Sequence, residues 1–147
     1  MNKNFVSIAI CAAVFILSAS EVFACTCVKP KPVKEVYEYT SAIFSGKIIS
    51  TRLSGKYGRK IIIRVEKSWK GKLPKTVTIS TIAVGSMCGY TFTVGKRYLI
   101  YAGGDKATDL STDICSRTSL LSEAKEDVEI LNGLLTNDLA KTKSSPK

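Results

Sequence analysis

The segment Cys25-Thr26-Cys27-Val28 carries the clearest chemistry in this chain, because an export signal ends immediately before it. Lys3 supplies the positive end of that signal, residues 5–17 form its apolar stretch, and residues 22–24 (Val-Phe-Ala) give a small-residue cleavage site. The signal is therefore expected to span residues 1–24. Cleavage there leaves Cys25 with a free α-amino group beside its own carbonyl. Together these two groups can chelate a metal ion, and that ion need not belong to this chain.

The alternation of an extended chain predicts how these residues are presented. Cys25 and Cys27 point to one side and Thr26 to the other. If both cysteines are bonded to the body of the protein, the amine and carbonyl of Cys25 are held in place and Thr26 points outward. An α-amine titrates at about 7.7–8.0, so losing its proton to bind a metal costs little near neutral pH.

Four cysteines remain once Cys11 leaves with the signal, namely Cys25, Cys27, Cys88 and Cys115. An even number in a small exported chain predicts two disulfides. Three pairings are open, although a bond between Cys25 and Cys27 would close a strained ring, so each is expected to reach a distant partner. A thiol oxidoreductase would need these two cysteines free or bonded to each other, and nothing nearby obviously lowers a thiol pKa.

Composition argues against an enzyme and against a resident cofactor. The chain contains no histidine, which removes the commonest general base and metal ligand, and no pair of carboxylates stands out. Beyond the signal, no apolar run approaches the roughly 18 residues of a membrane span, so no transmembrane segment is expected in the mature chain.

The charge balance is strongly basic, with 22 Lys and Arg against 12 Asp and Glu and a net charge of +10. We expect this excess to serve mainly as a solubilising surface, with weak binding of polyanions as a second role. Lys29, Lys31 and Lys34 form a basic patch beside the amino end. Exported proteins seldom meet nucleic acid, so no nucleic-acid partner is expected.

The remaining pattern predicts one mainly β domain over residues 25–136 and a polar flexible tail over 137–147. We expect a helix over Val33–Thr40, strands over Ala42–Arg52, Arg59–Lys70, Lys75–Val84, Arg97–Ala102 and Ala107–Ile114, and a final helix that Thr118 or Ser119 caps. That helix carries Leu121, Ala124, Val128, Leu131 and Leu135 at helical spacing. The alternation in the second strand places Ile61, Ile63, Val65 and Trp69 on one face. A five-stranded OB-fold-like Greek-key barrel with flanking helices fits this length, although periodicity alone does not distinguish it from a sandwich.

Several motifs, taken in order, resemble the tissue inhibitors of metalloproteinases. Cys25-Thr26-Cys27-Val28, followed by Pro30 and Pro32, is similar to the start of that family. Four later stretches are similar to the family's first strand, the end of its second strand, its cysteine-glycine-tyrosine motif and the approach to its last helix: residues 42–47, 69–71, 87–90 and 115–120. The resemblance covers most of residues 25–135 and includes all four mature cysteines, in a compact form that looks bacterial.

This resemblance implies a netrin-like barrel of the OB type, with disulfides Cys25–Cys88 and Cys27–Cys115. It also implies a monomeric inhibitor, secreted or periplasmic, whose Cys25 amine and carbonyl chelate the catalytic zinc of a metalloprotease and displace its activating water. Thr26 would enter the specificity pocket of the protease. The remaining contacts would come from Cys27, Val28, Ser86 and Met87. Together with Cys25 and Thr26 these residues would form the ridge that enters the cleft of the protease.

The chain departs from the family pattern in ways that leave alternatives open. It lacks the third disulfide of the family's amino-terminal domain and the whole cysteine-rich carboxyl domain, so contacts outside the protease cleft are not carried over. A netrin-like exported module that binds a polyanion or a partner protein is the alternative function. In the plainest alternative, Cys25 and Cys27 only fasten the amino end to the barrel.

Two other routes of export would remove the free amine. Lipoprotein processing also cuts before a cysteine, and acylation would then consume the thiol of Cys25 and block its amine. Phe23 fits the usual small residue of that signal poorly. Cleavage after Ser20 would instead leave the nitrogen of Cys25 inside a peptide bond.

Overall fold

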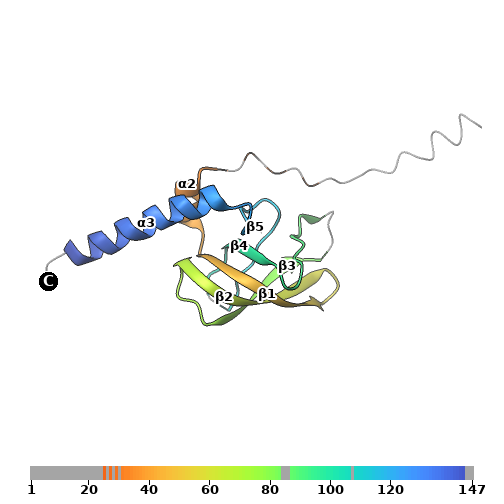
Figure 1. The fold of residues 1–147 in the computed structure, drawn as a ribbon. Coiled ribbons are helices and arrows are strands. Elements are labelled where there is room, and N and C mark those ends of the chain that lie inside the picture. Colours follow the sequence, from red (N-terminus) through yellow and green to blue (C-terminus); the bar gives the residue numbers. More distant parts are fainter. Residues whose placement is uncertain are drawn as a thin grey trace, which may run out of the picture.

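The computed structural model describes residues 25, 27, 29, 31–83, 87–106 and 108–144, and for residues 137–144 the backbone alone. Within these residues the fold is mainly β, with five antiparallel strands in one sheet and two helices (Figure 1). Along the chain the elements are α2 (Val33–Tyr39), β1 (Ala42–Ser54), β2 (Gly58–Lys70), β3 (Thr76–Ile82), β4 (Arg97–Ala102), β5 (Ser119–Leu120) and α3 (Lys125–Ser144). The order of strands across the sheet is β3-β2-β1-β4-β5.

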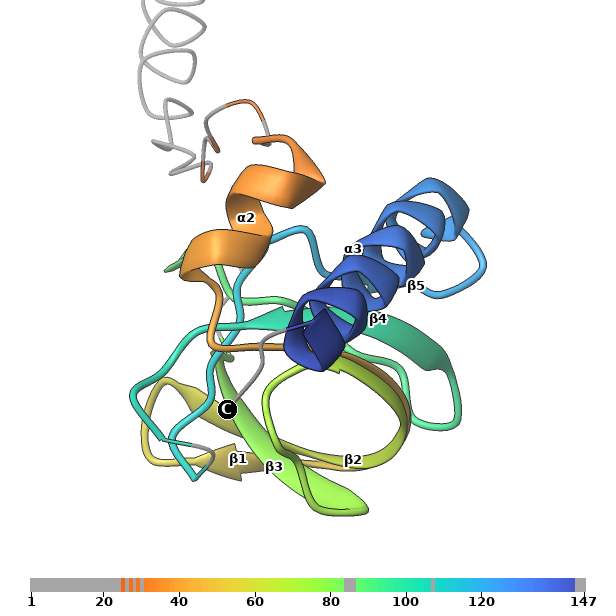
Figure 2. The ribbon, with the colours of Figure 1, turned by 90° about the vertical axis from the view of Figure 1, so that its left-hand side faces the viewer.

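The sheet curves, and both helices lie on the same outer side of it (Figure 2). Residues 110–112 link β3 at one edge to the end of β4. The amide of Ser80 donates to the Leu110 carbonyl at 2.8 Å, and the amide of Thr112 donates to the Ser80 carbonyl at 3.0 Å. Ser111 and Gly103 exchange two backbone bonds of 2.8 and 3.0 Å. This linking segment connects the two sides of the curved sheet.

The strand predicted over Ala107–Ile114 is wrong as a continuous strand. Ala107 lies outside the described residues, and Ser111 and Asp113 form only isolated bridges. The Thr112 hydroxyl donates to the Tyr101 carbonyl at 2.9 Å, and such side-chain bonds compete with a regular backbone ladder. The fifth strand is instead β5, which pairs with β4.

Alternation along the strands produces two apolar clusters. In β4, Tyr98 and Ile100 join a cluster inside the curved sheet, whereas Leu99 and Tyr101 join a cluster beneath the helices. The buried members of the inner cluster are Ala42, Phe44, Ile48, Ile61, Ile63, Val77, Ile79, Phe92, Tyr98, Ile100, Ala102 and Leu110. Those of the outer cluster are Val33, Val36, Ile43, Trp69, Leu99, Tyr101, Ala124 and Leu131.

Trp69 belongs to the outer cluster, so the prediction that it shares a face with Ile61, Ile63 and Val65 is wrong. The pairing of β1 with β2 explains the difference. Gly46 lies opposite Val65 and Ser45 lies opposite Lys67, which leaves Glu66 as an extra residue. Such a bulge reverses the alternation beyond it and turns Trp69 toward the helices. There Trp69 Nε1 donates to Asn132 Oδ1 of α3 at 2.8 Å.

The last helix begins later than the sequence predicts. Neither Thr118 nor Ser119 caps it, since Ser119 lies in β5 and the hydroxyl of Thr118 accepts a bond from the Tyr101 amide at 3.0 Å. The predicted apolar residues still pack in the outer cluster, Leu121 and Ala124 from the turn ahead of α3. The backbone is helical to Ser144, beyond the boundary that we expected near Asn137. Neither described helix is both long and apolar enough to serve as a membrane span.

Tyr90 and Tyr101 should make the free energy of unfolding depend on pH in the alkaline range. Burial raises the pKa of Tyr90 to about 12, and burial together with a hydrogen bond to Asp127 raises the pKa of Tyr101. In the unfolded chain both ionise near pH 10, so the unfolded state loses its protons first. Stability should be intact below about pH 10 and should fall as the pH rises toward 12.

Chemical denaturation at several alkaline pH values measures this fall. Tyr90→Phe should make it shallower, because the substitution removes one of the two shifted groups. Tyr57→Phe replaces an exposed tyrosine and should leave it unchanged. The same pH dependence in Tyr90→Phe as in the parent protein would contradict the prediction.

Candidate functional site

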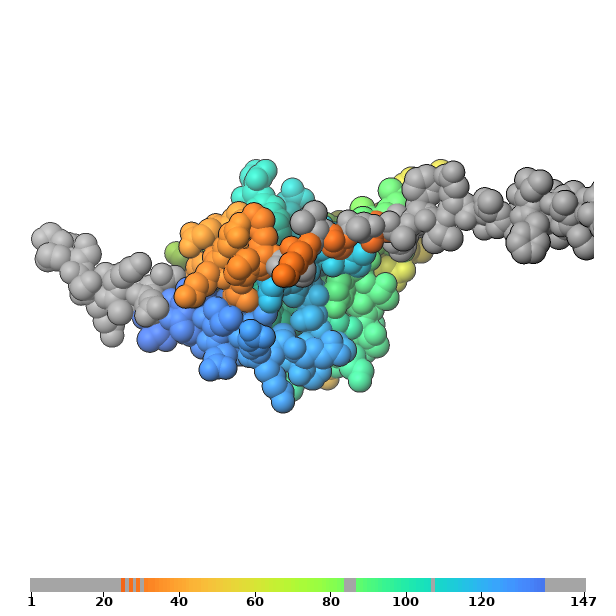
Figure 3. Space-filling model, turned by 90° about the horizontal axis from the view of Figure 1, so that it is seen from above, coloured from red at the N-terminus to blue at the C-terminus, as the bar shows by residue number. Residues whose placement is uncertain are grey.

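Two disulfides fasten the amino end to the body of the protein. They join Cys25 to Cys88 and Cys27 to Cys115, the same pairs that the resemblance implies, with Cα–Cα distances of 5.5 and 5.2 Å. The partners lie 63 and 88 residues away along the chain, one after β3 and the other ahead of β5. The described part of the amino-terminal segment lies at the surface next to α2 (Figure 3). Two covalent bonds within three residues therefore restrain the backbone at Cys25.

The segment around Cys88 is shaped by its glycine neighbour. A Cβ added to Gly89 would lie 1.8 Å from the Ile82 carbonyl oxygen, so no other residue fits without displacing the end of β3. Cys88 itself has a φ of 62°, in the left-handed region that few non-glycine residues adopt. Its carbonyl accepts from the Ile114 amide at 3.0 Å. Gly89 therefore lets the backbone next to Cys88 pack directly against the end of β3.

Of the predicted contact residues, the structure places Cys25, Cys27 and Met87. Met87 is 44% exposed and directly precedes Cys88, so it is adjacent in sequence to the Cys25 disulfide. Thr26, Val28 and Ser86 lie outside the described residues.

The turn that carries Cys115 is held by Asp113. One carboxylate oxygen of Asp113 accepts the amides of Cys115 and Ser116, both at 2.8 Å. The Ser116 hydroxyl donates back to the Asp113 carbonyl at 2.8 Å. A side chain that bonds its own backbone two and three residues on fixes a turn locally. The anchor for Cys27 is therefore itself rigid.

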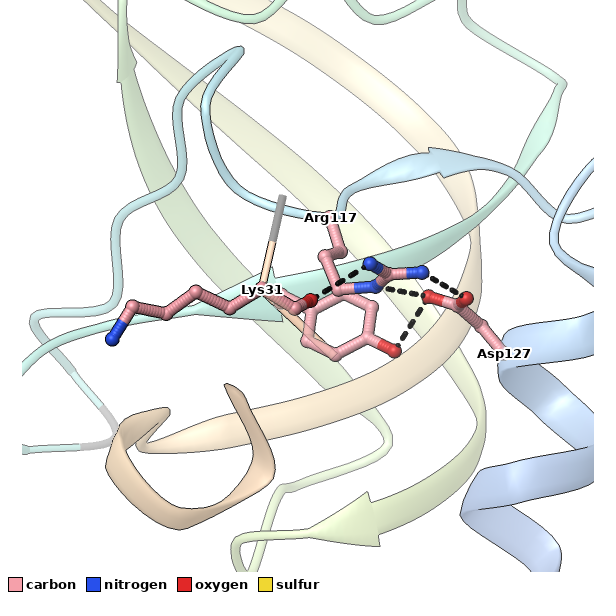
Figure 4. Close-up of polar contacts among 4 residues, drawn as sticks. Lys31, Arg117 and Asp127 are labelled. Carbon is pink, nitrogen blue, oxygen red and sulfur yellow. Dashed lines mark hydrogen bonds and ion pairs between the residues drawn. The ribbon is translucent and has the colours of Figure 1, made fainter. Parts of the chain in front are cut away.

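A third fastening, besides the disulfides, is a partly buried polar cluster centred on Arg117 (Figure 4). Arg117 Nη1 donates to the Lys31 carbonyl at 2.9 Å. Its Nε and Nη2 donate to the two carboxylate oxygens of Asp127 at 2.8 and 2.5 Å. The hydroxyl of Tyr101 donates to Asp127 at 2.8 Å. We call Arg117, Asp127 and Tyr101 the arginine clamp.

The arginine clamp connects the amino-terminal segment to the first turn of α3. Asp127 is only 8% exposed, and its pairing raises the pKa of Arg117 through the hydrogen bonds between them. A bidentate pair between Arg and carboxylate is directional as well as strong. The clamp therefore sets where the backbone at Lys31 lies relative to the barrel.

Sequence reasoning missed the arginine clamp. One signal for it is present, because Asp127 falls between Ala124 and Val128 on the apolar face of the last helix. A carboxylate in such a position needs a buried partner. No sequence pattern identifies Arg117 as that partner, or Lys31 as the third member.

A groove of about 750 Å³ borders the amino-terminal segment. The disulfide residues Cys27 and Cys115, the aromatic residues Tyr39 and Tyr101, and Arg117 contribute to its lining. Lys29 and Lys31 of the predicted basic patch also line it, whereas Lys34 is exposed on α2. Lys31 forms an ion pair with Glu35, whose hydrogen bond raises the pKa of the lysine. The patch is therefore partly neutralised.

Among the described residues, no group of three or more Cys, Asp or Glu is placed to hold a metal ion. The amine and carbonyl of Cys25 remain the metal-binding groups that the sequence predicts.

No protein-family model matches this chain, and no curated protein matches it significantly.

Proposed function

We propose that the mature protein begins at Cys25 and is a secreted or periplasmic inhibitor of zinc metalloproteases. The observation that carries the proposal is the double fastening of the amino end, with Cys25 bonded to Cys88 and Cys27 bonded to Cys115. Either bond alone would already attach the amino end to the body of the protein. Two bonds within three residues instead hold a terminal amine and its carbonyl in one orientation.

In the proposed complex, the deprotonated α-amine and the carbonyl oxygen of Cys25 bind the zinc of the protease. They displace the water that the metal would activate, so peptide hydrolysis stops. Thr26 enters the adjacent specificity pocket, and Val28, Ser86 and Met87 contact the rims of the cleft. The proposed inhibitor contributes no metal and performs no reaction.

Rigidity accounts for the expected affinity. Ordering a free chain end on binding costs about 1–2 kcal/mol for each residue fixed. Here the disulfides and the bond from Arg117 to Lys31 restrain that end before binding. A restrained ligand loses less freedom in the complex and therefore binds more tightly.

We also propose that the sheet is a netrin-like barrel of the OB type. Its support is the link through residues 110–112, which bonds to Ser80 of β3 and to Gly103 after β4. The continuous inner cluster is the core that such a barrel requires.

Titration against a panel of purified proteases tests the proposed function. The processed protein should inactivate one or more zinc proteases at one molar equivalent and leave serine proteases active. Equal inhibition of both classes, or full activity of every zinc protease at excess protein, would refute it.

Loss of the arginine clamp should weaken inhibition by loosening the ridge. Arg117→Ala removes the bond to Lys31 and leaves Asp127 without its cation. Because the Arg117 and Asp127 side chains are 24% and 11% exposed, we expect a stability loss between surface and fully buried pairs, about 2 kcal/mol. Denaturation measures the stability, and protease titration measures the affinity.

A double variant separates position from stability. Adding Asp127→Ala to Arg117→Ala removes the unpaired carboxylate and should recover part of the lost stability. The bond to Lys31 stays absent, so the affinity should remain low. Recovery of affinity together with stability would show that the clamp acts only on folding.

A further inference from the structure

A row of cations crosses the outer face of the sheet. The register places Lys47 of β1 directly opposite Arg64 of β2 on one side and opposite Arg97 of β4 on the other. All three are exposed, and each is next to a buried residue of the inner cluster, so they share the outward side. Three positive side chains therefore lie in cross-strand register.

A pair of cations farther along β1 and β2 extends this row. Arg52 of β1 lies opposite Lys60 of β2, and both are exposed. Lys60 and Arg64 are four residues apart in β2, about 13 Å at the usual rise of a strand. Lys96 precedes Arg97 and is exposed as well. We call these six residues the cationic strip: Arg52, Lys60, Arg64, Lys47, Arg97 and Lys96.

The register of the cationic strip is unfavourable unless an anion is present. Like charges directly opposite each other destabilise a sheet. One carboxylate is at hand, because Arg97 Nε donates to Glu66 Oε1 at 3.0 Å. Within the part of the chain that the structure describes, Lys47, Arg64 and Lys96 have no ion-pair partner. The strip therefore attracts a ligand with several negative charges.

One end of the strip is hollowed. A recess of about 600 Å³ is lined by Lys47, Lys96 and Arg97 together with Leu120, Leu121 and Ser122. Cations thus form one part of its lining, and two half-buried leucines and a hydroxyl form another. Small-ligand sites commonly have volumes of about 300–1,000 Å³ and a similar mixture of apolar and polar walls.

We propose that the cationic strip and this recess bind an anionic glycan, a saccharide chain that carries phosphate or sulfate esters. The oxyanions pair with the strip, for which the two-pronged Arg side chains are suited. A sugar of the chain enters the recess, with its apolar side against Leu120 and Leu121 and a hydroxyl near Ser122. A planar bilayer does not enter a recess, and the strip has no aromatic side chain on which nucleic-acid bases could stack.

This second site is separate from the ridge. Arg97 begins β4, and Gly103, which lines the groove beside the amino-terminal segment, follows the last residue of that strand. Six residues of strand separate them, about 20 Å. Inhibitor and glycan sites can therefore be occupied together, so that the glycan would hold the protein at a surface where proteases act.

Binding to a short dextran sulfate tests the proposal, with uncharged dextran of the same length as the control ligand. The parent protein should bind the sulfated chain and not the neutral one, and binding should weaken as salt is raised. Lys47→Gln combined with Arg97→Gln should raise the Kd about tenfold. Lys34→Gln combined with Lys106→Gln removes the same net charge elsewhere and should change the Kd little.

Two comparison probes decide whether the ligand class is right. Phosphatidylglycerol vesicles and single-stranded DNA should both bind more weakly than the dextran sulfate. Tighter binding of either probe would overturn the glycan assignment, and equal effects of the two double variants would overturn the site. The amine-blocked protein should bind the glycan as the parent does, so the failure of protease inhibition would leave this proposal standing.

Discussion

One alanine placed before Cys25 is expected to weaken protease inhibition by about a thousandfold. The added residue converts the α-amine into an amide, whose nitrogen is not basic and does not coordinate zinc. Direct ligation of a metal contributes several kcal/mol, and about 4 kcal/mol corresponds to that factor. The expected loss is large because the proposed mechanism has a single pair of zinc-binding groups. Protease titration with each form measures it.

The controls for this prediction separate chemistry from folding. The extended protein should form both disulfides and unfold at the same denaturant concentration as the parent, because the added alanine leaves all four cysteines and both described apolar clusters unchanged. Acetylation of the amine should have the same effect on inhibition with a much smaller added group. Peptide sequencing must first show that the exported product starts at Cys25, since an acyl group or residues 21–24 would already block the nitrogen. Equal potency of the free and extended forms would refute chelation.

Removal of the disulfide Cys27–Cys115 by changing both residues to serine is expected to cost both stability and affinity. With Cys25–Cys88 still in place, the bond closes a loop of about 30 residues in the unfolded chain, and the chain-entropy estimate for such a loop is about 3–4 kcal/mol. That is a large share of the 5–15 kcal/mol by which small domains are stable. Guanidinium denaturation of the double serine variant measures the loss.

The affinity of this variant for the protease tests the role of Cys27 more specifically than its stability does. Cys25–Cys88 remains and keeps the amine attached, but the chain at residue 27 is released. The proposed ridge then loses one of its two covalent anchors, so inhibition should weaken even at temperatures where the variant is fully folded. A variant that is less stable but inhibits as tightly as the parent would show that Cys27 serves stability alone.

The sequence predicted the strands better than the segments between them. The first four strands, β1 to β4, begin and end within two residues of the predicted bounds. Their β-branched residues alternate clearly, and turn residues flank them. The alternation failed where Glu66 forms a bulge and turns Trp69 to the other face. Bulges depend on the pairing partner, which no local pattern contains.

The start of the last helix was mispredicted for a related reason. Thr118 has the right side chain for a cap, but its hydroxyl bonds to Tyr101, seventeen positions earlier in the chain. A tertiary hydrogen bond thus outweighed a local preference. The apolar positions from Leu121 onward were nevertheless correct, because burial sets them whether the backbone there is a turn or a helix.

The sequence likewise predicted only part of the candidate site. The disulfide pairs follow from the resemblance, and the alternation of an extended chain suggested how the amino end is presented. The bonds of Arg117 to Asp127 and to Lys31 join residues 10 and 86 positions apart, and neither spacing carries a signal. The like-charged register at Lys47 likewise became visible only when the strand pairs were known.

The most direct measurement is the visible absorption spectrum of a target protease in which Co²⁺ replaces the catalytic zinc. The bands of Co²⁺ report its ligands, so a nitrogen and an oxygen that replace water must change them. We predict that one equivalent of the processed protein shifts the bands and that the alanine-extended form does not. An unchanged spectrum under full inhibition would contradict the account, because the protein would then block the protease without touching its metal.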